Sequence, residues 1–228
     1  MLPRTGAAVH DGVMADSDSR NGERYATRPI LDWCVDVHAA HDDALARAFA
    51  TPPDVPAIMV GPSEGQLLAL LCRLARVHRA VEIGTLVGYS ALHIARALPP
   101  DGHLWSIEHE PRHAALARAN LAAAGLGAKV SVLEGAGVDV LPTLEAHGPF
   151  DAVFIDADKA SYAHYGRWAM ANLRPGGVVL GDNAYLFGEL LDDSDRGRAM
   201  RGFHQQVAAG CDSVCAPTPD GMVIGIKR

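Results

Sequence analysis

Short apolar runs alternate with helical segments along most of this 228-residue chain, and this alternation limits the fold more than any other feature. Apolar runs without polar alternation predict strands buried on both faces, as in a parallel sheet covered by helices. Such runs occur at residues 80–83, 103–107, 130–133, 150–155, 178–180, 213–216 and 222–226. No helical segment separates the last two, so an antiparallel hairpin is expected there. The sequence therefore predicts an α/β fold: a doubly wound, Rossmann-like, mostly parallel seven-stranded sheet with an antiparallel C-terminal edge hairpin.

The segments between the predicted strands have the apolar spacing of helices. Helices are expected at residues 65–77, 89–98, 112–124, 138–146, 162–173 and 194–208. Upstream, the apolar pattern at 27–50 indicates one helix or two shorter ones, ended by Thr51-Pro52-Pro53. Residues 1–24 are polar and lack periodicity. We therefore expect a flexible N-terminal arm over 1–24 and a single domain over 25–228.

Charge and hydropathy exclude several classes of partner. The net charge is −7, whereas a protein that binds nucleic acid needs a dense positive surface. No apolar run approaches the roughly 20 residues that span a bilayer, and the N-terminus lacks the pattern of a signal peptide. We expect no nucleic-acid partner, no membrane partner and a cytoplasmic location.

The four cysteines, Cys34, Cys72, Cys211 and Cys215, form no CxxC pair and no metal-ligand spacing. This pattern is typical of reduced thiols in an intracellular protein. A disulfide between Cys211 and Cys215 is the alternative.

A glycine-containing turn follows the first predicted strand, in the segment EIGTLVGYS at residues 82–90. Gly84 allows a sharp turn and a close approach of the backbone to a ligand. The helix that follows Gly88 offers free N–H groups for an anion, and Ser90 adds a hydroxyl. The glycine spacing differs from the GxGxxG of dinucleotide-binding folds, which disfavours a nicotinamide oxidoreductase.

An acidic residue follows the second predicted strand directly. Glu108 stands where carboxylates in such folds accept hydrogen bonds from ribose hydroxyls. Glu110 is better explained as a charge at the start of the next helix. The alternative is that both are solvated acids at a helix N-terminus.

Charged and amide side chains also follow the fourth and fifth predicted strands. Asp156, Asp158 and Lys159 come after the fourth strand, and Asp182 and Asn183 after the fifth. Charges directly after buried strands are unfavourable unless they have a partner. Neighbouring parallel strands would bring Asp156, Asp182 and Asn183 together as an all-oxygen set suited to Mg²⁺. Helix N-capping by the aspartates is the alternative.

The segments EIGTLVGYSA, IEHEP, FDAVFIDADKASY and RPGGVVLGDN together resemble a known family in order and spacing. They are similar to the metal-dependent catechol and caffeoyl-CoA type O-methyltransferases, over about residues 59–228. The resemblance implies S-adenosylmethionine as methyl donor and Mg²⁺ or another divalent cation. It also implies a small catechol-like acceptor whose hydroxyl is methylated. We further expect a homodimer.

The resemblance also implies roles for individual residues. The methionine part of S-adenosylmethionine would be held by Glu82, Gly84, Ser90 and the backbone near Val60. Glu108 would bind the ribose, Ala136 would contact adenine through its backbone, and Asp156 would face both the cofactor and the metal. The metal ligands would be Asp156, Asp182 and Asn183. Lys159, one of three lysines in the chain, would be the general base, with a plain ion pair to Asp156 or Asp158 as the alternative.

The chain departs from the catechol enzymes at Ala157 and Asp158, where those enzymes carry bulky aromatic residues near the acceptor. Two other functions stay open on sequence grounds. One is a metal-independent methyltransferase in which the aspartates are structural, and the other is a catalytically silent protein that binds S-adenosylmethionine.

Overall fold

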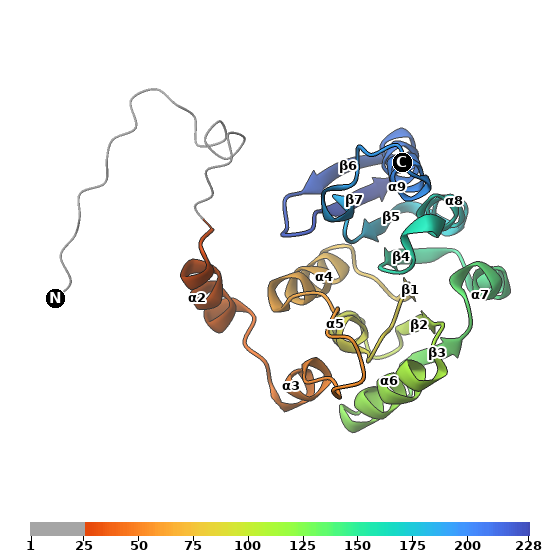
Figure 1. Ribbon diagram of the computed structural model, residues 1–228. Helices are drawn as coiled ribbons and strands as arrows, with labels where there is room; N and C mark the ends of the chain where they lie inside the picture. The colour runs from red at the N-terminus through yellow and green to blue at the C-terminus, as the bar shows by residue number, and fades with distance from the viewer. Residues whose placement is uncertain (1–25) are drawn as a thin grey trace. The chain divides into compact units, whose positions relative to one another are not determined.

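The computed structural model describes residues 26–228 (Figure 1). The predicted arm at 1–24 lies outside the described residues. The described residues divide into two units, one ending at Ala40 and the other spanning His41–Arg228, and each is described by itself. The segment expected to be helical over 27–50 is two helices, α2 (Arg28–His38) in the first unit and α3 (Asp43–Phe49) in the second.

The second unit contains a seven-stranded sheet with the order β3-β2-β1-β4-β5-β7-β6. Its strands are β1 (Arg79–Ile83), β2 (His103–Glu108), β3 (Val130–Glu134), β4 (Phe150–Ile155), β5 (Leu173–Gly181), β6 (Cys211–Ala216) and β7 (Met222–Lys227). Strands β1 to β5 pair in parallel, and β7 runs antiparallel to both β5 and β6. The predicted doubly wound sheet with an antiparallel edge hairpin is confirmed. Its strand order reverses between β1 and β4, where ligands bind in open sheets of this type.

Helices cover both faces of this sheet (Figure 1). They are α4 (Pro62–Leu74), α5 (Tyr89–Ala97), α6 (Pro111–Ala123), α7 (Gly137–Leu144), α8 (Tyr162–Asn172) and α9 (Asp195–Gly210). Side chains of α4, α5 and α6 contribute to one hydrophobic core, and those of α7, α8 and α9 to a second. Residues along β4 alternate between the two: Phe154 belongs to the first, and Val153 and Ile155 to the second. This alternation explains why the strands are apolar at almost every position.

Two elements begin three or more residues before their predicted starts. Helix α4 begins at Pro62 rather than residue 65, because Pro62 occupies the first turn and the Glu64 carboxylate accepts the Gly61 N–H at 2.9 Å. Strand β5 begins at Leu173 rather than 178 and therefore contains Pro175. Its pairing with β4 shifts register between Phe150 and Ala152. This irregularity accommodates a proline that has no N–H to donate.

All four cysteines are free thiols. Cys211 and Cys215 lie four residues apart on the extended strand β6, too far apart for a disulfide. The alternative of a Cys211–Cys215 bridge is therefore wrong. Across residues 26–228, no helix combines the length and the apolar character that crossing a membrane requires.

Candidate active site

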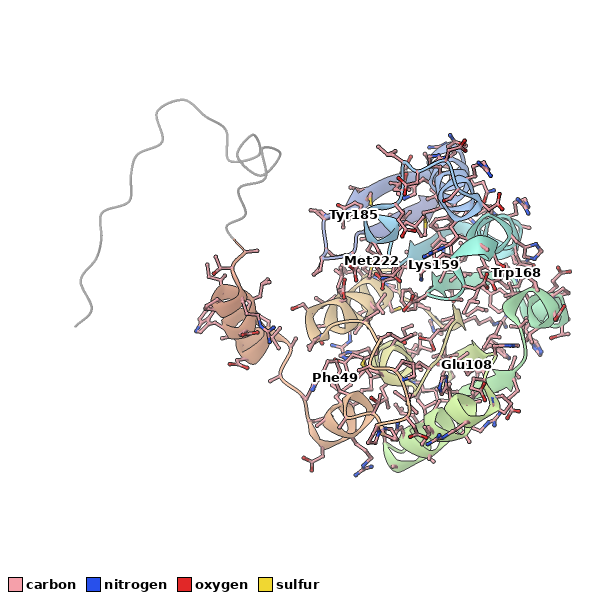
Figure 2. All side chains as sticks on the ribbon, in the orientation of Figure 1. Phe49, Glu108, Lys159, Trp168, Tyr185 and Met222 are labelled. Carbon is pink, nitrogen blue, oxygen red and sulfur yellow. The ribbon has the colours of Figure 1, made fainter. Side chains whose placement is uncertain are left out.

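A cavity of about 860 Å³ opens at the carboxyl ends of β1, β2, β4 and β5. Its volume lies within the range typical of small-molecule sites. Most of the residues predicted from the sequence line it: Val60, Gly84, Ser90, Glu108, Ala136, Asp156, Lys159 and Asn183. Glu82 and Asp182 do not line it, since both are buried beneath its surface. Figure 2 labels Glu108, which ends β2, and Lys159, which follows β4.

Gly84 makes the turn that ends β1, with a φ of +100°. A Cβ at this position would collide with the carbonyl oxygen of Asp156. Glycine is therefore required here because the backbone that follows β4 passes close to Gly84. The sequence had suggested a different reason, namely that glycine lets a ligand approach the backbone. The Asp156 N–H donates to the Ile83 carbonyl at 2.9 Å. This close contact fixes the position of Asp156 relative to the turn.

Glu82 is fully buried near the carboxyl end of β1. Its Oε2 accepts a hydrogen bond from the Ser106 hydroxyl, which also contacts the hydroxyl of Thr85. Its Oε1 is buried and has no hydrogen-bond partner among the described residues. Burial raises the pKa of Glu82 from 4.5 to about 7, although the hydrogen bond from the Ser106 hydroxyl opposes this rise. An unpartnered carboxylate oxygen below the cavity is a position that a cationic group of a ligand would satisfy.

Glu108 is held rigidly at the edge of the cavity. Its Oε2 accepts the Leu86 N–H at 2.7 Å, and its Oε1 accepts the Glu110 N–H at 2.9 Å. His113 Nδ1 lies 3.7 Å from Oε1. The remaining lone pairs of this carboxylate are free to accept hydroxyl groups. Glu110 is the N-cap residue of α6, which agrees with its interpretation as a charge at the helix start.

The loop after β3 forms another wall of the cavity. The Gly135 N–H donates to the Glu108 carbonyl at 2.9 Å, which holds this loop beside the end of β2. Ala136 follows as the N-cap residue of α7. A Cβ on Gly137 would lie 2.9 Å from the Tyr165 hydroxyl oxygen. The glycine thus lets α7 and α8 pack closely beneath the loop.

Lys159 and Asp156 form an ion pair at the end of β4. Lys159 Nζ lies 3.0 Å from Asp156 Oδ1 and donates a second hydrogen bond to the Tyr162 hydroxyl at 3.1 Å. Asp158 instead accepts from the Tyr165 hydroxyl at 2.6 Å and from the Ser161 N–H at 3.0 Å. The partner of Lys159 is therefore Asp156 rather than Asp158. An ion pair alone does not exclude a catalytic role, because Lys159 also lines the cavity.

Asp182 and Asn183 follow β5 and lie beside this ion pair. Asp182 is 3% exposed, and its Oδ1 has no hydrogen-bond partner among the described residues. Burial raises the pKa of Asp182, and the negative charge of Asp156 raises it further. Asn183 adopts a left-handed conformation with a φ of +51°. The fold therefore concentrates oxygen atoms and repelling negative charges at this point.

Three residues of this region were not predicted from the sequence. Tyr162 is fully buried, and its hydroxyl lies 3.1 Å from the Ile155 carbonyl and 2.9 Å from the Asp182 carbonyl, so it joins the ends of β4 and β5. Glu64, on α4, has a buried Oε1 without a hydrogen-bond partner in the described part of the chain, and its charge contributes to the raised pKa of Asp182. Asp220 lines the cavity from the loop between β6 and β7. Only the tyrosine had a sequence signal, since it stands three residues after Lys159.

The predicted metal ligands comprise two carboxylates and one amide. Among residues 26–228, no group of three or more histidine, cysteine, aspartate or glutamate side chains is arranged to hold a metal ion. The set of Asp156, Asp182 and Asn183 contains only two such residues, so it stays a prediction.

Comparison with known proteins places the chain in a family. Residues 37–227 match a family described as O-methyltransferase. A catechol O-methyltransferase from Niastella koreensis is 42% identical over 171 residues, covering 73% of this chain and 77% of that protein. A catechol O-methyltransferase from Mycobacterium tuberculosis is 41% identical over 175 residues, covering 75% and 79%.

Solved structures agree with this result. The O-methyltransferase TomG from Streptomyces achromogenes, involved in tomaymycin synthesis and determined in complex with S-adenosylmethionine, superimposes with a TM-score of 0.80. It is 35% identical, and the match covers 88% of this chain and 96% of that protein. The family match spans the whole sheet and every residue of the cavity named above. This chain belongs to the O-methyltransferase family.

Proposed function

We propose that this protein transfers the methyl group of S-adenosylmethionine to one hydroxyl of a small catechol-like molecule, in a reaction that depends on Mg²⁺ or another divalent cation. One observation carries the proposal. Asp182 Oδ1 is buried beside Asp156 and has no hydrogen-bond partner within residues 26–228, and Asp156 is itself bonded to Lys159 at the wall of the cavity. These oxygens would bind the cation beside a side chain able to accept a proton.

The cavity suits S-adenosylmethionine. The fixed carboxylate of Glu108 would accept the ribose hydroxyls, and the backbone of Ala136 would contact adenine. The orphan oxygen of Glu82, together with Ser90, would hold the methionine part. When bound, the cofactor supplies a methyl group activated on a sulfonium. The relatives named above support this choice of cofactor, since TomG was determined with S-adenosylmethionine.

The residues after β4 and β5 suit a divalent cation of the Mg²⁺ type. Asp156, Asp182 and Asn183 offer only oxygen ligands, the type that hard cations prefer. The unsatisfied Oδ1 of Asp182 and the repulsion from Asp156 would both be relieved by a positive charge. When bound, the cation would lower the pKa of a chelated hydroxyl and fix its orientation.

Lys159 would act as the general base. Its Nζ is oriented by Asp156 Oδ1 at 3.0 Å and by the Tyr162 hydroxyl at 3.1 Å. These two contacts use two of the three positions on the amine. The third position is then available for the proton of the acceptor hydroxyl, and only the neutral amine would accept it.

The acceptor would lie against apolar surface at the mouth of the cavity. Phe187 lines the cavity and is 60% exposed, so it offers a ring face for an aromatic molecule. Ile58, also in the lining, is 70% exposed. These exposed side chains favour a small aromatic acceptor. The names of the Niastella koreensis and Mycobacterium tuberculosis relatives favour a catechol.

The test is methyl transfer from S-adenosylmethionine to catechol, with phenol as the matched monohydroxyl control. We expect a singly methylated product from catechol with Mg²⁺, none with EDTA, and recovery when Mg²⁺ is restored in excess. Phenol should give no product, because it lacks the second oxygen for chelation. Mass spectrometry of the products provides the measurement.

Two outcomes would replace this proposal with another function. Activity that survives both EDTA and Asp182→Ala indicates a metal-independent methyltransferase. Binding of S-adenosylmethionine without turnover of any vicinal diphenol indicates a catalytically silent binding protein.

The proposal extends to the assembly and setting of the protein. We infer a homodimer that acts on a small molecule in the cytoplasm, with no nucleic-acid or membrane partner. Light scattering of the full-length chain after size-exclusion chromatography measures its mass. A mass of one chain would exclude the dimer.

A further inference from the structure

Asp220 contacts a predicted metal ligand from a distant part of the chain. It lies in the loop between β6 and β7, is half-buried and lines the cavity. The Asn183 Nδ2 donates a hydrogen bond to Asp220 Oδ2 at 3.4 Å. Neither the predicted strands nor the motifs around residues 156 and 182 pointed to this residue.

The backbone places Asp220 at this position independently of its side chain. The Tyr185 N–H donates to the Asp220 carbonyl at 3.0 Å, and the Ala184 N–H donates to the Gly221 carbonyl at 2.8 Å. Within the loop after β5, the Leu186 N–H donates to the Asn183 carbonyl at 2.8 Å. The two loops therefore stay together when the carboxylate of Asp220 is replaced.

The chemistry of the pair fixes the direction of the Asn183 amide. An ionised carboxylate only accepts hydrogen bonds, so the amide group that faces Asp220 is the NH₂. The amide oxygen must then point away from Asp220. This matters because the oxygen has lone pairs for a cation, whereas the NH₂ has only donors.

We propose that Asp220 is a positioning residue, which holds the Asn183 amide with its oxygen available to a divalent cation. The inference rests on the metal dependence proposed above. Outer partners of metal ligands orient them, and their loss typically weakens metal binding by ~10–100-fold. The negative charge of Asp220 also polarises the amide and so strengthens its oxygen as a ligand.

A double-mutant cycle separates orientation from other effects of Asp220. In the Asn183→Asp background, residue 183 has an oxygen on both sides of its terminal group and needs no orientation. Asp220→Ala should therefore weaken cation binding by ~10–100-fold in the wild-type background and by less than about 3-fold in the Asn183→Asp background. A structural role of Asp220 would give the same loss in both.

The measurement is a titration of the full-length protein with MnCl₂, followed by the electron paramagnetic resonance signal of free Mn²⁺. Asp220→Asn is expected to give an intermediate loss, since its amide oxygen still accepts from Asn183 but the charge is gone. Asp101→Asn, at an exposed position, is the matched control and should leave Mn²⁺ affinity unchanged. Thermal melting verifies that each variant is folded.

The outcomes are distinct. A large loss for Asp220→Ala in the wild-type background alone supports the inference. The inference is overturned if Asp220→Ala reduces Mn²⁺ affinity equally in the wild-type and Asn183→Asp backgrounds. It is also overturned if Asp220→Ala reduces the affinity in neither background while the wild type binds Mn²⁺. Both results leave the proposed function standing. A wild-type protein that binds no Mn²⁺ and methylates catechol in EDTA overturns the inference and the metal dependence together.

Discussion

Two carboxylates of this protein are buried in positions that disfavour their charge. Glu82 has no exposed surface, and Asp182 is 3% exposed. Each retains one carboxylate oxygen that has no hydrogen-bond partner among the described residues. Burial raises the pKa of each, and the charge of Asp156 adds to both rises. Such groups reduce the stability of the fold without ligands, and residues of this kind concentrate at functional sites.

The pH dependence of the free energy of unfolding should reveal the raised pKa of Glu82. Burial raises its pKa from 4.5 to about 7, so the folded protein binds more protons than the unfolded chain between these values. The stability contributed by Glu82 therefore falls as the pH rises from about 4.5 to about 7, and it is lowest above that range. Glu82→Gln should stabilise the protein by about 1–3 kcal/mol at pH 8, with a gain that shrinks towards zero near pH 4.5. Urea unfolding at both pH values measures the difference, and an equal effect at the two values would contradict it.

Lys159 should affect the chemical step more than binding. Lys159→Met removes the amine that would accept the proton while keeping a long apolar side chain. We expect kcat to fall by ~10²–10⁴-fold, with the affinity for S-adenosylmethionine, measured by calorimetry, changed little. Lys129→Met is the control, because Lys129 bonds the Leu98 carbonyl away from the cavity. A loss of cofactor binding as large as the loss of kcat would point to a structural role for the Lys159–Asp156 ion pair.

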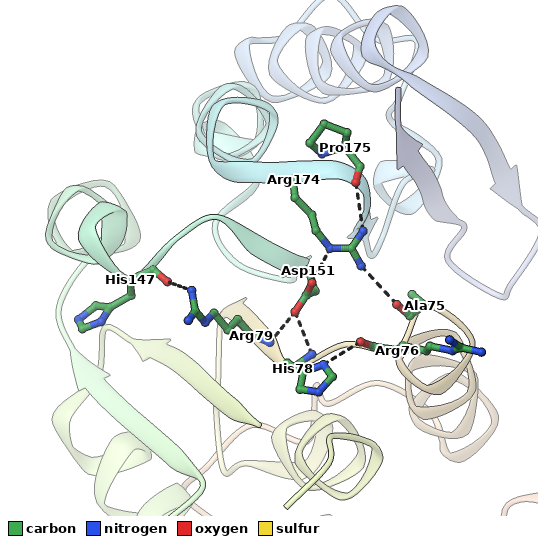
Figure 3. Close-up of polar contacts among 8 residues, drawn as sticks. All are labelled: Ala75, Arg76, His78, Arg79, His147, Asp151, Arg174 and Pro175. Atoms are coloured by element: carbon green, nitrogen blue, oxygen red, sulfur yellow. Dashed lines mark hydrogen bonds and ion pairs between the residues drawn. The ribbon is translucent and has the colours of Figure 1, made fainter. Parts of the chain in front are cut away.

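At the scale of the elements, Asp151 joins three strands at the end of the sheet opposite the cavity (Figure 3). Its Oδ2 accepts the N–H groups of His78 and Arg79, at 2.9 and 2.8 Å, and its Oδ1 contacts Arg174 Nε at 2.5 Å. Burial opposes ionisation, but the bonds to Arg174 and the two backbone groups outweigh it and lower the pKa of Asp151. The carboxylate thereby fixes the starts of β1, β4 and β5 relative to one another.

Removing this link should destabilise the sheet. Asp151→Ala leaves the two backbone N–H groups and Arg174 without their acceptor, so we expect a loss of about 1.5–3 kcal/mol in the free energy of unfolding. Asp212→Ala is the matched control, because its ion pair with Arg228 is largely exposed and should contribute less than about 1 kcal/mol. Chemical denaturation at pH 8 measures the free energy of unfolding of both variants and of the wild type. Equal losses in the two variants would mean that Asp151 does not link the strands energetically.

The sequence predicts elements better than it predicts contacts between them. Apolar runs identify strands because each strand in this sheet is buried on both faces, and parallel pairing then brings the residues after β4 and β5 to the same edge. Asp220 and Glu64 could not be found in this way. They reach the site through loops and helices whose packing is set by tertiary contacts, and neither stands directly after a strand of the parallel region. The start of β5 was missed for a related reason, since only the bulge opposite β4 allows Pro175 within a strand.

For the molecule as a whole, the two ends of the sheet have different roles. One end carries the paired and satisfied carboxylate of Asp151, and the other carries Glu82 and Asp182, each with an unsatisfied buried oxygen. A net charge of −7 adds to the repulsion among acids. Ligands that bring positive charge to the cavity end should therefore act as stabilisers of the folded state. This coupling gives a test of the site that is independent of turnover.

Mg²⁺ should raise the melting temperature of the wild-type protein but not that of Asp182→Asn. At Mg²⁺ concentrations about 100 times its Kd, binding to the folded state alone contributes about 2.7 kcal/mol, which corresponds to a rise of about 5–10 °C for a domain of this size. Without Mg²⁺, Asp182→Asn should melt at the same temperature as the wild type or higher at pH 8, because it removes a buried charge that burial and Asp156 disfavour. Differential scanning fluorimetry in EDTA and in Mg²⁺ gives both values, and S-adenosylmethionine should stabilise the two proteins alike. A Mg²⁺-dependent rise that persists in Asp182→Asn would show that the cation binds elsewhere.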